Sequence, residues 1–315
     1  MSQNKIRSTK ITVKNTEATE GHVDDKRRQI LRRMIINGIA SLVLIMIIVM
    51  TMPMTVLSYS ALFEYSTMIS LLLFLLILLI RYFGLLGMAY LWLNNYTFTK
   101  RPDFQPFVSV IVPVYNEGIL LRDAILSLLE LDYSNYEIII VNDGSSDNTY
   151  DVAKTMVGFQ QGMYGKVKVS LISKPNGGKA RALNAGISYS KSEIVLCMDG
   201  DSQLSPETIR NGARHFIDPR VGAVAGNVKV LNRGKFYADL QALEYIEGLN
   251  MARAAQSFLK LVNIIPGPIG LFRKKAIEEV GYYSSDTFAE DADLTLKILS
   301  KGWKVYYEPT SIAWT

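Results

Sequence analysis

The sequence has very few of the residues on which thiol and imidazole chemistry depends, with one cysteine and two histidines among 315 residues. Cys197 has no second cysteine to pair with, so an intrachain disulfide is excluded, in agreement with a reducing compartment. His22 and His215 fit neither a metal cluster nor a catalytic triad, and we expect both at the surface. No segment has the spacing of a Walker A loop, which disfavours P-loop ATPase chemistry.

Charged residues are almost absent from two long stretches before residue 100. Residues 1–33 are polar, with nine Lys and Arg against four Asp and Glu, and we expect a disordered cytoplasmic tail. Residues 34–57 carry no charge and are long enough to span a bilayer, whereas a signal peptide has a shorter apolar core. The basic block at 26–33 directly precedes this span. We therefore interpret it as a membrane-topology signal, and we expect no nucleic-acid partner.

A second apolar stretch runs from residue 67 to 93 and is interrupted by Arg81. Either the span covers about 61–80, with Arg81 reaching the interface and residues 82–96 lying along the lipid headgroups, or one tilted helix includes Arg81. Both interpretations give a membrane region at 34–96 with two transmembrane helices. The positive-inside rule then places the N-terminus and the residues after 100 in the cytoplasm. We expect a multi-pass protein of the inner or plasma membrane, in contact with lipid.

A linker at 97–106, with Pro102 and Pro106, leads into residues 107–315, where strand and helix patterns alternate. This alternation predicts an α/β domain with a mostly parallel sheet flanked by helices. We expect strands at 108–114, 137–141, 167–172, 193–198, 221–230 and 304–307, with a short strand after the loop that begins at 266. We expect helices at 119–131, from 147 to about 157, at 179–188, from 205, at 237–261 and at 291–302.

The central feature is Asp199-Gly200-Asp201, which follows an apolar run of strand length. Carboxylates at the carboxyl end of a buried strand lie where open α/β sheets bind ligands. Two carboxylates separated by glycine suit a hard divalent cation that is shared with substrate phosphates. The alternative is a polar turn, because Asp and Gly are common turn residues.

Other predicted strands also end in polar turns. The segment 113–117 offers an aromatic face and a carboxylate for a nucleotide base or ribose, and 142–147 contains an Asp-Gly turn. The segment 174–181 combines glycines, a helix start and cations, which suits a diphosphate. Because the loops after successive strands meet at one edge of a sheet, we expect these turns to converge.

The last predicted helix opens with Glu290, Asp291 and Asp293. Thr287 and Glu290 have capping-box spacing, which gives Glu290 a structural explanation. All three carboxylates are favourable at a helix N-terminus because of the helix dipole, but Asp291 and Asp293 lack the additional capping explanation. A carboxylate held opposite a metal-bound diphosphate can serve as general base for an acceptor hydroxyl.

Over roughly residues 106–315 the sequence resembles the family 2 glycosyltransferases with a GT-A fold. The motifs at 112–117, 141–147 and 176–184, followed by Asp-Gly-Asp and Glu-Asp in the same order, carry the resemblance. With the two preceding spans, the sequence is similar to membrane-embedded processive synthases of the poly-N-acetylglucosamine, hyaluronan, chitin and cellulose type.

The resemblance implies a role for each matching position. The uridine of a UDP-sugar would be held by Pro113, Tyr115, Glu117 and Asp143. The diphosphate would lie near Lys179, Arg181 and Asp199. A Mg²⁺ or Mn²⁺ ion would bind Asp201, together with Asp199.

The resemblance also implies an acceptor side. Asp291 would be the catalytic base, with Glu290 beside the substrate, and Gly267 and Pro268 would border the end of a growing glycan. The implied reaction is inverting transfer of a sugar, with UDP-N-acetylglucosamine as the preferred donor by likeness alone, to a β-linked polysaccharide.

The processive relatives carry a Gln-x-x-Arg-Trp motif and further helices downstream, whereas this sequence stops at Thr315. We therefore expect a C-terminally incomplete GT-A domain at 107–315, with a missing C-terminal half or an accessory subunit as a partner. Transfer to a polyprenyl-phosphate lipid, and a catalytically incomplete nucleotide-sugar-binding subunit, are the alternatives. A general nucleotidyltransferase is disfavoured, because the Glu-Asp pair would then lack a role.

Overall fold

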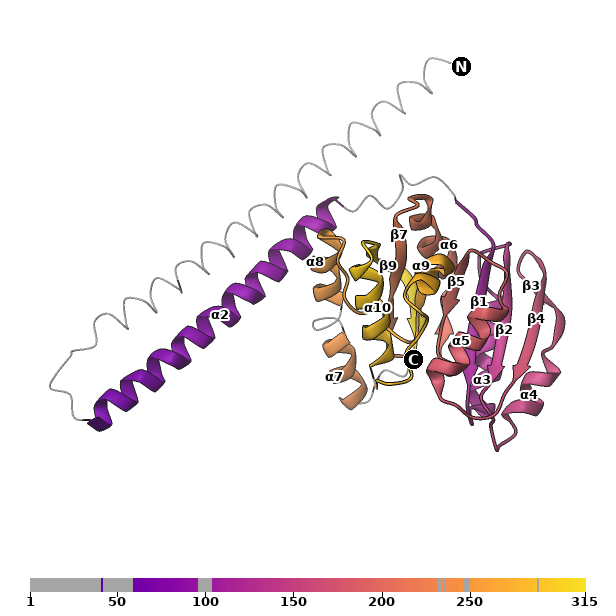
Figure 1. The fold of residues 1–315 in the computed structure, drawn as a ribbon, viewed down its shortest axis with the longest axis horizontal. Coiled ribbons are helices and arrows are strands. Elements are labelled where there is room, and N and C mark those ends of the chain that lie inside the picture. Colours follow the sequence, from indigo (N-terminus) through magenta and orange to yellow (C-terminus); the bar gives the residue numbers. More distant parts are fainter. Residues whose placement is uncertain are drawn as a thin grey trace, which may run out of the picture. The chain divides into compact units, whose positions relative to one another are not determined.

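The structure is a computed structural model that describes residue 41 and residues 59–95, 104–231, 234, 236–245, 250–287 and 289–315. By its internal contacts the chain divides into two units, residues 1–81 and residues 82–315. Figure 1 labels described helices and strands of these units. The predicted polar tail, almost all of the first predicted span and most of the predicted linker lie outside the described residues.

Helix α2 (Tyr59–Asn95) forms from the second apolar stretch and continues without a break through Arg81. The described part of the chain has one helix apolar and long enough to cross a membrane, Phe63–Asn94. Arg81 is thus within a helix, as the interpretation with one helix expects. Within the second unit, Ala89 and Trp92 are buried, and the Trp92 ring lies 5.8 Å from that of Tyr307.

The second unit is built on one sheet, whose described strands have the order β3-β4-β2-β1-β5-β8-β7-β9-β6. Four of the eight strand pairings are parallel and four are antiparallel, so the sheet is mixed and the prediction of a mostly parallel sheet was only partly correct. The strands are β1 (Val108–Val114), β2 (Tyr136–Asn142), β3 (Gly158–Gly162), β4 (Gly165–Ser173), β5 (Ile194–Cys197), β6 (Gln203–Leu204), β7 (Val221–Lys229), β8 (Gly270–Arg273) and β9 (Lys304–Trp314).

The antiparallel pairs arise at strands that the apolar pattern did not orient. Strand β8 runs antiparallel between β5 and β7, and β3 forms a hairpin with β4. The parallel group β4-β2-β1-β5 has the predicted arrangement. Strand β7 is antiparallel to β8, which is antiparallel to β5, so β7 and β5 point the same way, and β9 is parallel to β7. The carboxyl ends of β1, β2, β5, β7 and β9 therefore share one edge with the amino end of β8.

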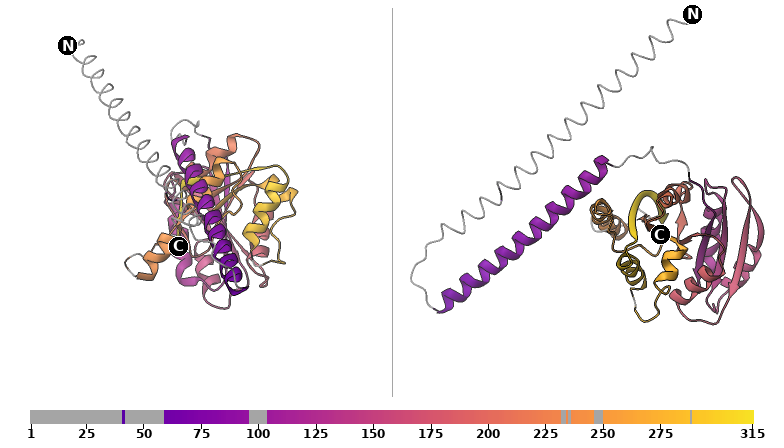
Figure 2. Two further views of the ribbon diagram at one scale, coloured as in Figure 1. Left: turned by 90° about the vertical axis from the view of Figure 1, so that its left-hand side faces the viewer. Right: turned by 45° about the horizontal axis from the view of Figure 1, so that its top comes forward.

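Helices cover both faces of this sheet (Figure 2). The described part of the predicted helix at 237–261 contains α7 and α8, and residues 246–249 between them lie outside the described residues. The described helices of this unit are α3 (Gly118–Leu129), α4 (Thr149–Thr155), α5 (Lys179–Tyr189), α6 (Thr208–Ala213), the 3-10 helix η1 (Arg214–Ile217), α7 (Phe236–Glu244), α8 (Ala252–Phe258), α9 (Lys274–Glu279) and α10 (Glu290–Ser300).

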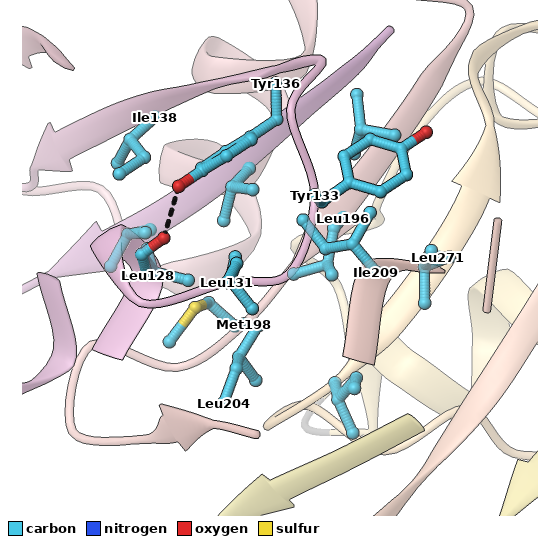
Figure 3. Packing of buried hydrophobic residues seen from close by; sticks show 14 of the residues in the cluster. Leu128, Leu131, Tyr133, Tyr136, Ile138, Leu196, Met198, Leu204, Ile209 and Leu271 are labelled. Carbon is cyan, nitrogen blue, oxygen red and sulfur yellow. Dashed lines mark hydrogen bonds between the residues drawn. The ribbon is translucent and has the colours of Figure 1, made fainter. Parts of the chain in front are cut away.

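Two hydrophobic cores sandwich the sheet, because β1, β2 and β5 are buried on both faces. One core joins alternate strand residues to α3 and α6; Figure 3 shows Leu128, Leu131, Leu196 and Ile209 packed together there. In the same view the Tyr136 hydroxyl donates a hydrogen bond to the Leu128 carbonyl. The other core joins the opposite strand residues to α5, α8, α9 and α10. Burial on both faces explains the uninterrupted apolar runs of these strands.

His215 was predicted at the surface, and that prediction was wrong. Its side chain is almost fully buried, and Nε2 lies 2.8 Å from the Glu308 carboxylate, which is also buried. A buried imidazole is tolerated because it has this polar partner.

Candidate active site

A cleft of about 500 Å³ lies at the carboxyl edge of β1, β2 and β5. Seven of the residues singled out in the sequence line it, and they come from four separate chain segments. They are Pro113, Tyr115, Glu117, Asp143, Lys179, Asp199 and Asp201. The predicted convergence of the strand-end turns is thus present in the structure.

The turns after β1 and β2 are hydrogen-bonded to one another. Asn116 has a left-handed backbone (φ 55°), which Asn tolerates better than most residues. Its side-chain oxygen accepts hydrogen bonds from the Ser146 backbone N–H at 2.8 Å and from the Ser146 hydroxyl at 3.3 Å. The Glu117 backbone N–H donates to the Thr149 hydroxyl at 2.9 Å. These bonds hold Tyr115 and Glu117 beside the second turn.

The Asp143 side chain, which follows β2, lies against the amino end of α5. Its buried carboxylate accepts hydrogen bonds from the backbone N–H groups of Gly177, at 3.0 Å, and Gly178, at 2.7 Å, and it forms an ion pair with Lys174. The predicted anion site of this loop therefore holds a carboxylate of the chain itself, the usual arrangement for an anion at a helix start. Lys174 belongs to the segment whose cations were predicted to suit a diphosphate, and in the structure it is paired with Asp143 instead.

Glu117 packs directly against the Asp-Gly-Asp turn. A Cβ at position 200 would lie 2.2 Å from Glu117 Oε2 and 2.9 Å from the Pro113 carbonyl oxygen, so only glycine fits this approach. Glu117 Oε2 is buried and has no hydrogen-bond partner among the described residues. Burial, followed by the charges of Asp201 and Asp199, raises the pKa of Glu117 to about 7.

Lys179 links the Asp-Gly-Asp turn to the start of α10. Its ammonium lies 2.6 Å from Asp199 Oδ1 and 3.9 Å from Glu290 Oε1. Burial lowers the pKa of Lys179, but the charges of Asp199 and Asp291 outweigh that effect and raise it. Through Lys179, the first residue of α10 is thereby brought close to the cleft, although it lies more than 100 residues away in the sequence.

Gly267 lies where these charged groups meet. A Cβ there would be 2.6 Å from Lys179 Nζ, 3.0 Å from Asp291 Oδ2 and 3.2 Å from Asp199 Oδ2. The three side chains therefore surround one small space that the glycine leaves open. Burial raises the pKa of Asp291 to about 6; Lys179 acts to lower it, while Glu290 and Asp199 add to the rise.

The remaining predicted positions lie outside the cleft lining. Arg181 is exposed on α5, and Pro268 is half-buried beside Gly267. The Thr287 hydroxyl accepts from the Ala289 N–H at 3.1 Å rather than from Glu290, so the predicted capping box is not formed. Asp293 forms an ion pair with Lys297 at 2.7 Å, which gives it a structural role on α10.

The cleft supplies oxygen ligands of the kind that Mg²⁺ and Mn²⁺ bind. Among the described residues no group of three Asp, Glu, His or Cys side chains is already arranged around a metal position. Asp201 is exposed, and Asp199 is half-buried and bound to Lys179. Two carboxylates whose coordination a substrate phosphate completes are a suitable donor set for Mg²⁺, so the residues present fit such an ion.

Comparison with known proteins identifies the family. The model for glycosyl transferase family 2 matches residues 109–281. The chain is 31% identical over 242 residues to poly-beta-1,6-N-acetyl-D-glucosamine synthase of Staphylococcus aureus (strain COL), and the match covers 74% of this chain and 57% of the relative. It is 32% identical over 208 residues to the synthase of the same name from Staphylococcus epidermidis, with 66% and 49% covered. The chain thus spans about half the length of these relatives.

A solved structure has the same architecture. A mannosyltransferase of Pyrobaculum calidifontis, in complex with GDP-Man and Mn²⁺, superposes with a TM-score of 0.59 at 26% identity, over 76% of this chain and 67% of that one. The matched family region contains the cleft residues from Pro113 to Asp201 and also Gly267. The chain belongs to glycosyl transferase family 2.

Proposed function

We propose that this chain transfers a sugar, with inversion, from a UDP-sugar to a growing β-linked polysaccharide at a membrane. N-acetylglucosamine is the preferred sugar, because two relatives are named as synthases of its polymer. The observation that carries the proposal is the meeting of Asp291 with Lys179 and Asp199 around Gly267. A half-buried carboxylate beside a cleft with a lysine and further carboxylates supports the proposal, because it can accept a proton from a hydroxyl that attacks a sugar bound there.

The donor side is the cleft between the β1 and β2 turns and α5. The exposed Tyr115 ring offers a stacking surface for the uracil, and the Glu117 and Asp143 carboxylates offer acceptors for its N–H and for ribose hydroxyls. Because Asp143 already takes the Gly177 and Gly178 amides, we assign the diphosphate to the Lys179 ammonium instead.

A divalent cation would be held by Asp201 and Asp199. When bound, it would stabilise the negative charge that develops on the leaving UDP. The similarity to a mannosyltransferase solved with GDP-Man and Mn²⁺ supports this assignment. In the chain itself, the Lys179 ammonium lies 2.6 Å from Asp199 Oδ1 and supplies a positive charge next to the position assigned to the diphosphate.

Asp291 would act as the general base. Its carboxylate accepts the proton of the acceptor hydroxyl as that oxygen attacks the anomeric carbon from the face opposite UDP. The raised pKa, about 6, makes Asp291 a stronger base than an exposed Asp while it stays ionised at neutral pH. Glu290 lies on the same helix start near Lys179 and would contact the donor or acceptor sugar.

Helix α2 supports a membrane location. It is apolar over Phe63–Asn94, and large apolar side chains such as Phe63 and Leu71 are exposed along it. With the positive-inside rule, we assign the sugar-transfer unit to the cytoplasmic face.

The test is a donor screen with the purified full chain in detergent. Radiolabelled UDP-sugars are supplied with Mn²⁺ and short oligosaccharides, and products are separated by size. We expect labelled N-acetylglucosamine in oligosaccharides and loss of transfer when the cation is chelated. Label found only in a polyprenyl-phosphate fraction, or UDP binding without any transfer, would refute the polysaccharide assignment.

A further inference from the structure

A second cavity, of about 420 Å³, opens at the same sheet edge as the donor cleft, on the other side of β8. Its described lining comes from residues at the carboxyl ends of β7 and β9, among them Lys229 and Trp314, and from Ala242, Tyr245 and Asn250. The loop that contains Gly267 leads into the amino end of β8, which lies between the two groups of strands. Gly267, which lies against Asp291, and the second cavity are therefore at the same edge of the sheet.

The lining is apolar and aromatic with a few polar groups, as in carbohydrate and small-molecule sites. The Trp314 indole N–H donates to the Ser205 hydroxyl at 2.9 Å, which fixes the orientation of its ring. The Lys229 ammonium lies 5.3 Å from the centre of that ring. Tyr245 and Asn250 complete the polar part.

Asn250 gives the strongest indication of a ligand. Its side-chain oxygen is buried and has no hydrogen-bond partner among the described residues. A buried acceptor without a donor is costly, so such an atom is usually explained by a partner bound from outside. Because this atom is an acceptor, the outside partner has to donate a hydrogen bond to it.

We propose that this second cavity binds a sugar unit of the acceptor glycan, some residues away from the hydroxyl that receives the new sugar. This inference rests on the proposed function and names the part of the acceptor that the second cavity recognises. Sugar hydroxyls and N-acetyl N–H groups donate to Asn250 Oδ1, hydroxyl oxygens accept from Lys229, and the apolar face of the ring lies on Trp314.

The same lining argues against a lipid phosphate as the occupant. A phosphate at neutral pH supplies acceptor oxygens, and these leave the Asn250 oxygen without a donor. Lys229 is the one cationic side chain among the described lining residues. A neutral glycan supplies the hydrogen-bond donor that the Asn250 oxygen lacks.

The test uses the purified full chain in detergent and a neutral hexamer of β-linked N-acetylglucosamine, with the dimer for comparison. Asn250→Leu removes the acceptor and keeps the number and branching of the side-chain heavy atoms. Asn135→Leu is the matched control, because Asn135 is an exposed residue directly before β2, at the opposite edge of the sheet. Calorimetry measures binding of the hexamer and of UDP, and thermal unfolding checks the fold.

We expect Asn250→Leu to bind the hexamer about tenfold more weakly, as for loss of one buried hydrogen bond. UDP binding and the dimer should be affected little, and the melting temperature should not fall, because an unpaired polar atom has been removed. Asn135→Leu should behave as the wild type.

Equal hexamer affinity in Asn250→Leu and the wild type would overturn the inference, as would a wild-type chain that binds polyprenyl phosphate but no hexamer. The two proposals can fail separately. If Asn250→Leu transfers sugar normally and binds the hexamer as the wild type does, only the proposal that the second cavity binds the acceptor is refuted. Hexamer binding that depends on Asn250, in a chain that transfers no sugar from any donor, supports the second cavity and refutes the proposed function.

Discussion

Replacing Gly267 by alanine tests the arrangement of the charged groups with a single methyl group. The backbone at this position does not have the positive φ that requires glycine, so the added Cβ is the whole perturbation. That Cβ would lie 2.6 Å from Lys179 Nζ and 3.0 Å from Asp291 Oδ2. To lengthen the distance between this Cβ and Lys179 Nζ from 2.6 Å to an ordinary contact of 3.4 Å, the ammonium has to move by about 0.8 Å.

The expected effects on stability and on transfer differ in size. The lysine end is flexible, and alanine lowers the entropy of the unfolded chain, so the free energy of unfolding should change by no more than about 1 kcal/mol. Catalytic groups misplaced by about 1 Å can cost roughly 100-fold in rate. We therefore expect sugar transfer to fall by about 10- to 100-fold while the fold is kept.

The assay is steady-state transfer from the UDP-sugar, together with UDP binding and thermal unfolding of the same preparations. Gly87→Ala, in α2, is the matched control, because a Cβ there meets nothing within 4 Å. A Gly267→Ala chain that transfers sugar at the wild-type rate would refute the placement of Lys179 and Asp291 around this glycine.

Two further predictions concern single carboxylates. Because Asp291 has a pKa of about 6 and acts ionised, transfer should fall about tenfold per pH unit below pH 6, and a rate that is flat from pH 7 to pH 5 would contradict this role. The pKa of Asp291 is raised in the folded chain, so its protonated form is favoured by folding. Its contribution to the free energy of unfolding is therefore fully present below about pH 4 and is lost as the pH rises through 6. Asp143→Ala leaves the Gly177 and Gly178 amides without their carboxylate, so the free energy of unfolding should drop by about 2–4 kcal/mol and UDP binding should weaken. Denaturant unfolding and calorimetry measure both, and a variant of wild-type stability would refute the anchoring role of Asp143.

The cleft could be predicted because its residues follow buried strands. Val114, Asn142 and Met198 each end an apolar run, and parallel strands bring such ends to one edge. The order of the polar turns was therefore sufficient to place Tyr115, Asp143 and Asp199 together.

The parts that could not be predicted depend on long-range contacts. The four residues of β8 do not indicate whether the strand runs parallel or antiparallel to its neighbours. The burial of His215 depends on its contact with Glu308, which is 93 residues away in the sequence. The capping box of Thr287 had the correct spacing, yet its hydroxyl binds Ala289, because local spacing does not fix the path of the chain before α10. The hydrogen bonds from the Gly177 and Gly178 amides to Asp143 likewise depend on a long-range contact, because Asp143 follows β2 and the two glycines follow the neighbouring strand β4.

The most direct test of the account is Asp291→Asn in the full chain, assayed for sugar transfer and for UDP binding with Mn²⁺. Removal of a general base should lower transfer by about 10²- to 10⁴-fold, while UDP binding, which uses the other end of the cleft, stays near that of the wild type. A variant that elongates the acceptor at the wild-type rate would contradict the account.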